Sequence, residues 1–260
     1  MPGRPADTSA AAPKLKWGYG IGALLLGLGI WQATVWLTDA PHYILPSPWR
    51  VAQAALFSHA LIWENTLVTG TEVLLGLLIG TVFGVISAVL LASSRQIQQL
   101  ILPILVFTQA VPVFALAPML TLWFGYGMAS KIVMTVLIIY FPVTSAFHDG
   151  LTQVNRGYLD LGQTMGATKA QIMWRIRIPY ALPTLGTGLR LAAVYAPIGA
   201  VIGEWVGASN GLGYLMLLAN GRAKIDLMFA SLIALAILTL LLHKVIGVLA
   251  DRLSRYSNIG

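Results

Sequence analysis

Long apolar runs separated by short polar stretches dominate the pattern along the chain. A helix that crosses a membrane needs about 20 consecutive, mostly apolar residues, because each residue advances the helix by about 1.5 Å. The runs that meet this condition predict six spans, at 17–37, 65–92, 97–124, 131–147, 183–206 and 227–249. The fourth run is short, and prolines interrupt the third. The pattern therefore predicts an all-α polytopic membrane protein with about six transmembrane helices.

The polar segments complete the predicted organisation. Residues 1–16 are polar and rich in Ala and Pro, which predicts a disordered N-terminus. A transmembrane domain follows at 17–249, with its longest polar loop at 148–182 and a polar tail at 250–260. The first apolar run is longer than the core of a signal peptide, about 7–15 residues, so we expect it to remain as a span. Residues 49–57 predict a short amphipathic helix at the membrane interface.

Composition and charge agree with a membrane protein. Hydrophobic residues make up 57% of the chain and charged residues only 10%, whereas a soluble domain carries about 25% charged residues. These values disfavour a soluble enzyme and exclude a disordered chain. The absence of cysteine excludes disulfides, thiol nucleophiles and thiolate metal sites.

The distribution of basic residues predicts the orientation. The net charge is +7, and with the N-terminus inside, eleven of the sixteen Lys and Arg residues lie in predicted cytoplasmic segments and four lie outside. Lys and Arg collect on the cytoplasmic side of membrane proteins. This bias predicts a cytoplasmic N-terminus, and we read the positive charge as a membrane feature without a nucleic-acid partner.

Small residues recur at a spacing of four in two of the predicted spans. This spacing places them on one helix face, where they allow another helix to approach closely. The residues are Gly76, Gly80, Gly84 and Ala88 in the second span, and Gly199, Gly203 and Gly207 in the fifth. We interpret both stripes as packing surfaces.

Five residues in the spans are candidates for a substrate pathway: Glu72, Gln109, Pro112, Arg190 and Glu204. Gln109 lies between two prolines near mid-membrane, where a pathway lining and an interhelical hydrogen bond are equally supported. Charged residues within spans are costly and usually face the bundle interior. Glu72 falls in the outer half and Arg190 in the inner half, which argues against direct pairing. Glu204 precedes a Gly-rich stretch and can also be interfacial.

The predicted cytoplasmic loop at 148–182 contains two short helical stretches on either side of Gly166. Thr168 is a good N-cap for the second stretch. Ile172, Ile176 and Pro179 recur at helical spacing, which predicts a helix–Gly–helix element that ends at Pro179. Physical reasoning alone favours a surface helix that lies on the membrane.

The same loop resembles the EAA loop of ABC importer permeases. Gly166, Ile176, Ile178 and Pro179 match the spacing of that motif, and Asp160-Leu161-Gly162 occupies the Glu-Ala-Ala places, so that only the acidic residue is approximated. From about residue 45 to the C-terminus the chain is similar to the nitrate, sulfonate, taurine and pyrimidine-precursor branch of the family. The segments that carry this likeness include Leu45-Pro46-Ser47-Pro48, Leu122-Trp123-Phe124-Gly125 and Gly211-Leu212-Gly213-Tyr214.

The resemblance implies a type I ABC importer permease of a bacterial inner membrane. It implies a second permease copy, which we take as a homodimer because closed two-fold pairs are the commonest assemblies. It also implies cytoplasmic ABC ATPase subunits and a periplasmic or lipid-anchored binding protein. Residues implied to couple to the ATPase are Asp160, Gly162, Gly166, Ala167, Ile172, Ile176, Ile178 and Pro179.

The chemistry is expected on the partner. The chain has no Walker A pattern, so ATP and Mg²⁺ are expected on the ATPase, and this chain is expected to hold no cofactor, metal or catalytic residue. The substrate that the resemblance favours is the pyrimidine precursor of thiamine, followed by sulfonates, taurine and nitrate.

The sequence leaves three alternatives to an importer permease. An ion-coupled secondary transporter usually needs ionisable residues near the midplane, and none is evident. An intramembrane enzyme needs a metal or triad pattern, which the four scattered histidines do not form. A structural membrane subunit would share the glycine stripes, but it has no use for a helix–Gly–helix cytoplasmic element.

Overall fold

The computed structural model describes residues 14–257, and this part of the chain contains helices and no strand. The helices are α1 (Lys14–Thr38), α2 (Pro48–Phe57), α3 (His59–Ser93), α4 (Arg95–Ala110), α5 (Val113–Phe124), α6 (Met128–Thr152), α7 (Arg156–Thr164), α8 (Lys169–Ile172), the π-helix η1 (Met173–Arg177), α9 (Ile178–Gly207), α10 (Leu212–Gly221) and α11 (Ile225–Ser257).

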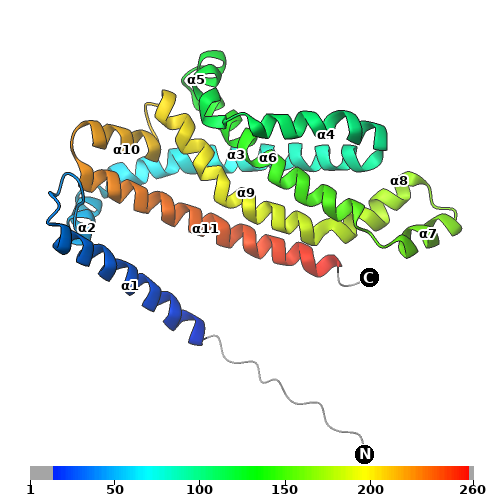
Figure 1. Cartoon of the computed structure of the whole chain (residues 1–260), viewed down its shortest axis with the longest axis horizontal. Coiled ribbons are helices and arrows are strands. Elements are labelled where there is room, and N and C mark those ends of the chain that lie inside the picture. The colour runs from blue at the N-terminus through cyan, green and yellow to red at the C-terminus, as the bar shows by residue number, and fades with distance from the viewer. Residues whose placement is uncertain (1–13, 258–260) are drawn as a thin grey trace, which may run out of the picture.

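Long helices form a bundle with short helices at both ends (Figure 1). Helices α3, α6, α9 and α11 run along the long axis, α2 and α10 lie at one end, and α7 and α8 lie at the other. Helix α1 diverges from the bundle, and its apolar stretch buries no residue. Within the described residues, five helices are long and apolar enough to cross a membrane, and the bent pair α4–α5 brings the number to six. The all-helical prediction with about six spans is confirmed.

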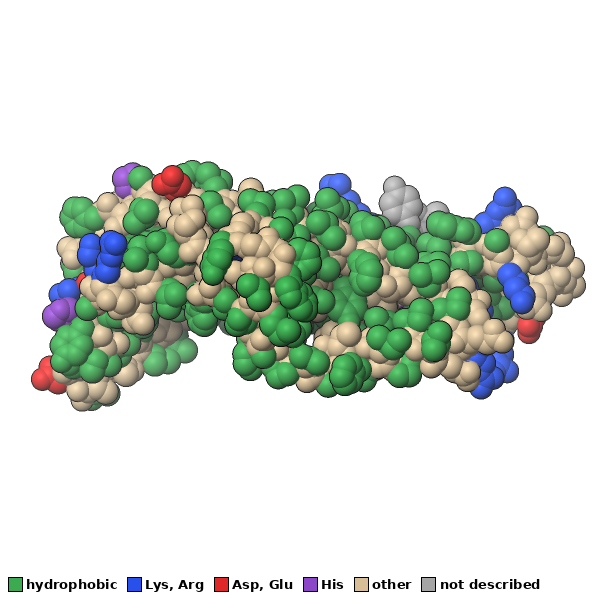
Figure 2. All heavy atoms as spheres, turned by 90° about the horizontal axis from the view of Figure 1, so that it is seen from above, with side chains coloured by type: hydrophobic (Ala, Val, Ile, Leu, Met, Phe, Trp, Pro, Cys, Tyr) green, Lys and Arg blue, Asp and Glu red, His purple; other side chains and the backbone are tan. Residues whose placement is uncertain are grey.

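The surface is divided along the same axis. Figure 2 shows a face dominated by hydrophobic side chains between two ends that carry most of the charged side chains visible on it. Such an apolar band is what a bilayer requires, because lipid cannot solvate charge.

Several boundaries differ from the prediction. Helix α6 has 25 residues, so the fourth span is not short. The hydropathy pattern missed its ends because Lys131 and His148 are buried polar residues inside the fold. Helix α11 continues to Ser257 and includes most of the predicted tail. Residues 1–13 of the predicted disordered stretch lie outside the described residues, whereas 14–16 begin α1.

The helical element after Gly166 does not end at Pro179. Helices α8, η1 and α9 continue into one another from Lys169 to Gly207. In η1 the Ile178 backbone N–H donates to the Met173 carbonyl, five residues back, so the turn is wider than in an α-helix. Proline lacks an N–H and its ring crowds the preceding turn of an α-helix, and a widened turn just before Pro179 accommodates it.

The third span is broken at a single place. Helices α4 and α5 meet at an angle of 96°, with Val111 and Pro112 extended between them. A proline disfavours the helical region for the residue before it, which explains the extended Val111. Pro103 and Pro118 lie inside α4 and α5 without ending them. Proline alone therefore did not locate the break.

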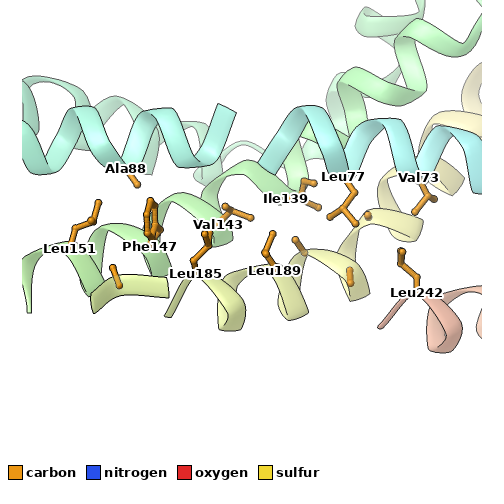
Figure 3. Packing of buried hydrophobic residues seen from close by; sticks show 14 of the residues in the cluster. Val73, Leu77, Ala88, Ile139, Val143, Phe147, Leu151, Leu185, Leu189 and Leu242 are labelled. Carbon is orange, nitrogen blue, oxygen red and sulfur yellow. The ribbon is translucent and has the colours of Figure 1, made fainter. Parts of the chain in front are cut away.

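The core lies where α3, α6 and α9 pack together (Figure 3), around Leu77, Ile139, Val143, Phe147 and Leu189. The glycine stripes lie in these contacts. A Cβ atom built at Gly76 would lie 2.5 Å from Cγ2 of Thr135, and one at Gly80 would lie 2.7 Å from Cδ1 of Ile139. The prediction that the stripes are packing surfaces is confirmed.

Gly199→Ala is expected to destabilise the protein. Its Cβ would lie 2.7 Å from the Cα of Thr135, so α9 and α6 must separate, and overpacking of this kind costs about 1–3 kcal/mol. Gly247→Ala is the control, since no heavy atom lies within 4 Å of its Cβ position and Ala favours a helix by roughly 0.5–1 kcal/mol. Thermal unfolding in one detergent should give shifts of opposite sign. Equal shifts would contradict the packing argument.

Candidate functional site

A turn at Gly166 joins α7 to α8. The chain adopts φ +77° at Gly166, a left-handed conformation that glycine adopts without strain. The Gly166 N–H donates to the Gln163 carbonyl and the Ala167 N–H donates to the Gly162 carbonyl, both at 2.9 Å. These two bonds form a Schellman motif, which satisfies the free carbonyls at the end of α7.

Side-chain caps fix the starts of both short helices. Asn155 Oδ1 accepts a hydrogen bond from the Gly157 N–H at 2.9 Å at the start of α7. At the start of α8, Thr168 Oγ1 accepts from the Gln171 N–H at 3.2 Å, and Gln171 Oε1 accepts from the Thr168 N–H at 2.8 Å. This capping box confirms the predicted N-cap at Thr168.

The two short helices pack through Gly162. A Cβ atom built there would lie 3.0 Å from Cδ1 of Ile176 and 3.6 Å from Cγ1 of Ile172. Three predicted coupling residues, Gly162, Ile172 and Ile176, are therefore brought together. Ile178 and Pro179 are half-buried at the start of α9, Ala167 is half-buried after the turn, and Asp160 is exposed on α7.

The tip of this element carries large exposed apolar side chains. Met165 is 79% exposed and Trp174 68% exposed, and Tyr158 and Leu161 are more than half exposed. The α7–α8 element lies at one end of the bundle (Figure 1). Large apolar side chains gathered on an exposed face are typical of a protein-interaction site. The sequence held a signal for part of this surface, because 158, 161 and 165 share one helix face.

The element is tied to the rest of the bundle on both sides. The Arg177 side chain donates from Nη1 to the Ala92 carbonyl at the end of α3, at 3.3 Å. A cleft of about 510 Å³ lies between α7, α8 and this end of α3, with Leu159, Lys169 and Trp174 among its walls. The continuous helix from Lys169 to Gly207 forms the second connection. The α7–α8 element is therefore connected to both α3 and α9.

A second polar site is buried at the opposite end, where α3, α9 and the start of α10 meet. Glu204 is only 1% exposed. Its Oε1 accepts from Thr69 Oγ1 at 2.6 Å, and its Oε2 accepts from the Gly213 N–H at 2.5 Å. Thr69 Oγ1 in turn accepts from the Leu212 N–H at 2.8 Å. The reading of Glu204 as interfacial is wrong, because its carboxylate anchors the first turn of α10.

Lys131 belongs to the same buried site, whereas the prediction put it at the outer end of the fourth span, among the outside basic residues. It is 2% exposed. Its Nζ donates to the carbonyls of Gly207 and Tyr126 at 2.5 Å and of Gly127 at 2.9 Å. The ammonium group also attracts the carboxyl groups of Glu72 and Glu204. Hydropathy could not find this residue, because its pairing depends on segments distant in sequence.

The five pathway candidates fall in three places. Glu72 and Glu204 lie together in the buried site, where Glu72 Oε2 has no hydrogen-bond partner among the described residues. Arg190 forms an ion pair with Asp251 of α11, Nη2 to Oδ1 2.5 Å, which agrees with the expectation that it does not pair with Glu72. Gln109 is exposed near the α4–α5 break, where Pro112 lies. Their part in a pathway stays a prediction.

Residues 80–256 match the family described as the binding-protein-dependent transport system inner membrane component. The chain belongs to this family. The match covers the α7–Gly166–α8 element, Lys131, Glu204 and the α10 anchor. A member of this family is a multi-pass inner-membrane protein, and as the permease of such a system it works with an ATPase and a substrate-binding protein.

Curated relatives are transport permeases. The chain is 56% identical over 224 residues to the "Probable ABC transporter permease protein" of Haemophilus influenzae, covering 86% of this chain and 90% of that protein. It is 40% identical to the formylaminopyrimidine transport permease protein ThiX of Halalkalibacterium halodurans, over 73% of this chain and 76% of that protein. It is 36% identical to the riboflavin transport system permease protein RibX of Chloroflexus aurantiacus, over 90% and 88%.

A solved structure shares the fold of the permease. The structure is that of the MetNI methionine ABC transporter in inward-facing conformations, with a TM-score of 0.60, 20% identity and coverage of 80% of this chain and 98% of that chain. At this identity the likeness speaks for the fold alone. The expected type I importer permease fold is confirmed.

Proposed function

We propose that this permease forms the substrate pathway of an ATP-driven importer and couples it to the ATPase through the α7–Gly166–α8 element. The observation that carries the proposal is the set of exposed apolar side chains on this element, Tyr158, Leu161, Met165 and Trp174. In this proposal they lie outside the bilayer. A surface of this kind needs a protein partner to cover it.

Coupling would proceed by rigid-body movement. When the ATPase subunits close on ATP, they would displace the tip. The Gly166 turn sets the angle of α7, and the helix from Lys169 to Gly207 transmits the displacement along the bundle. Arg177 and its bond to the Ala92 carbonyl would move the end of α3 with it. Two discrete arrangements of packed helices are the usual basis of such a switch.

ATP hydrolysis is assigned to the partner ATPase, which would hold ATP and Mg²⁺. The sequence of this chain has no Walker A pattern to cradle a nucleotide. In this proposal, the permease contributes a pathway and a mechanical contact, and it is not the enzyme of the complex. No cofactor, metal ion or catalytic residue of this chain takes part.

The assembly that we propose places the N-terminus and the tip in the cytoplasm. Arg156, Lys169, Arg175 and Arg177 lie at the tip end, in agreement with the tendency of basic residues to stay inside. A second copy of the permease would complete the pathway as a homodimer. A periplasmic or lipid-anchored binding protein would deliver the substrate at the α2–α10 end.

For the substrate we propose a small nitrogen heterocycle, with the pyrimidine precursor of thiamine ranked first. This ranking is supported by the relative named for formylaminopyrimidine and by the relative named for riboflavin, which is also a heterocycle. Sulfonates, taurine and nitrate are the second candidates. Arg190, the one arginine in the spans predicted from the sequence, is engaged by Asp251, which leaves an anion little to bind there.

The test is an affinity purification of the tagged protein from gently solubilised native membranes. We expect an ATPase subunit in roughly equal amount and a binding protein in the same complex. The recovered binding protein is then titrated with pyrimidines, riboflavin, sulfonates and nitrate. Recovery of the intact permease without any ATPase would contradict the importer assignment. Binding of a sulfonate or nitrate in preference to heterocycles would contradict the substrate assignment alone.

A further inference from the structure

A polar cavity and an apolar groove adjoin where α2 meets α3 and α11. The cavity has a volume of about 270 Å³ and lies beside His42, Arg50 and Lys224. The groove has a volume of about 550 Å³ and lies between α3 and α11. The end of α2 and the start of α3 separate them, because Ala54 and Ser58 face the cavity whereas Ala55 and His59 face the groove.

The cavity carries an excess of positive charge. Arg50 holds the Asp226 carboxylate, with Nη2 to Oδ2 at 2.9 Å and Nε to both oxygens at 3.3 Å. Lys224 forms no ion pair with any residue in the described part of the chain. One carboxylate therefore faces two permanent cations, which leaves room for one further anion. Both sides of the Arg50–Asp226 pair remain partly exposed.

The groove is apolar and shorter than the hydrocarbon core of a bilayer. Its walls run from His59 to Leu74 on α3 and from Ala230 to Leu241 on α11. At about 1.5 Å per residue these stretches advance about 22 Å and about 17 Å, whereas the hydrocarbon core is roughly 30 Å thick. An acyl chain fits this length, whereas a spanning helix of a second copy would need a groove as long as the whole core. Trp63, one of the lining residues, is exposed, and tryptophan prefers the membrane interface.

We propose that this site binds one anionic diacyl phospholipid, with its phosphate between Arg50 and Lys224 and an acyl chain in the groove. Such a lipid matches the site in both charge and shape. Its anionic headgroup would face the cationic cavity, and its acyl chain would lie in the adjoining apolar groove. The groove also lies where α3 and α11 are loosely apposed: a Cβ atom at Gly70 would meet nothing nearer than Cδ1 of Leu238, at 3.9 Å. A lipid there would fill the contact between the two helices.

The test is lipid titration of the purified transporter, followed by native mass spectrometry. Phosphatidylglycerol is compared with phosphatidylcholine of the same chains and with inorganic phosphate. We expect one tightly bound phosphatidylglycerol per chain. Lys224→Gln should weaken it about five-fold, since one basic residue near an anionic headgroup contributes about 1 kcal/mol. In Gly70→Leu the Cβ atom meets nothing nearer than 3.9 Å, and the rest of the side chain should displace phosphatidylglycerol by filling the groove.

Two control variants make the result decisive. Lys244→Gln removes an exposed cation in the other half of α11, away from the cavity. Gly247→Leu adds a side chain at a position where a Cβ atom has no heavy atom within 4 Å. Both should bind lipid as the unmodified protein does. Equal affinity for the two lipids, or unchanged binding in Lys224→Gln and Gly70→Leu, would overturn the proposal, as would binding of phosphate alone.

A cross-linking experiment separates a lipid from a second copy in the groove. The chain has no cysteine, so Leu67→Cys in the groove and Gly27→Cys on α1 can be combined without background. We expect no cross-link between two copies treated with a short bis-maleimide. An efficient intermolecular cross-link would show that α1 of a second copy covers the groove, and it would also overturn the proposal.

Discussion

Gly166→Leu is expected to reduce association of the ATPase by about 5–30-fold, because a non-glycine residue in the left-handed conformation costs about 1–2 kcal/mol. The cost arises from the backbone and not from a clash, since φ is +77° and nothing lies within 4 Å of the Cβ position. Relief of the strain would break the Schellman bonds from Gly166 and Ala167. Helix α7 would then present the apolar tip at another angle, and uptake would fall with docking.

Co-purification of the ATPase and substrate uptake in cells measure this effect. Gly166→Asn distinguishes the effect of backbone conformation from that of an added side chain, because asparagine tolerates the left-handed region better than other non-glycine residues. This variant should retain most of the ATPase association. Gly157→Leu is the matched control, since Gly157 is exposed on α7 and its φ is not left-handed. If Gly166→Leu kept normal ATPase content and uptake, the coupling role of the turn would be wrong. If Gly166→Leu and Gly166→Asn lost ATPase association equally, the effect would come from a side chain that blocks contact with the ATPase and not from the backbone conformation.

Features that depend on near neighbours in sequence could be predicted. The turn at Gly166 and the cap at Thr168 are set within a few residues, and both appear where the pattern placed them. The stripes at Gly76 and Gly199 follow from helical spacing, which the sequence displays directly. The exposed apolar face of α7 could also be predicted from the helical spacing of its residues. Its proposed role in coupling came only from the resemblance of the loop to the EAA loop.

Features that depend on distant segments could not be predicted. Lys131 was predicted at the outer end of the fourth span, because a charge ends an apolar run. In the fold it is buried, and its ammonium donates to the carbonyl of Gly207, 76 positions away. Glu204 looked interfacial because it precedes a Gly-rich stretch, and the partner that buries it, Thr69, lies on another helix. The third span contains Pro103, Pro112 and Pro118, and only Pro112 lies at the break, so the presence of a proline did not locate it.

Lys131→Met is expected to destabilise the protein by about 3–5 kcal/mol, the usual cost when one partner of a buried charged group is removed. Methionine has a similar length but no donors. Three carbonyl groups, those of Tyr126, Gly127 and Gly207, would lose their hydrogen bonds. The carboxyl groups of Glu72 and Glu204 would also lose the favourable influence of the ammonium charge. The start of α10 would loosen with it, because Glu204 holds the Gly213 N–H.

Thermal unfolding in detergent measures the change, and a double-mutant cycle assigns its cause. Lys244→Met, at an exposed position, should change stability by no more than roughly 0.5 kcal/mol. Glu204→Gln alone is destabilising, but combined with Lys131→Met it should cost less than the sum, by about 0.5–3 kcal/mol, because the second change removes the unbalanced charge. Strict additivity would show that Lys131 acts through the carbonyls alone. A Lys131→Met shift no larger than that of Lys244→Met would contradict the buried site, because burial of the ammonium is what makes the two lysines differ.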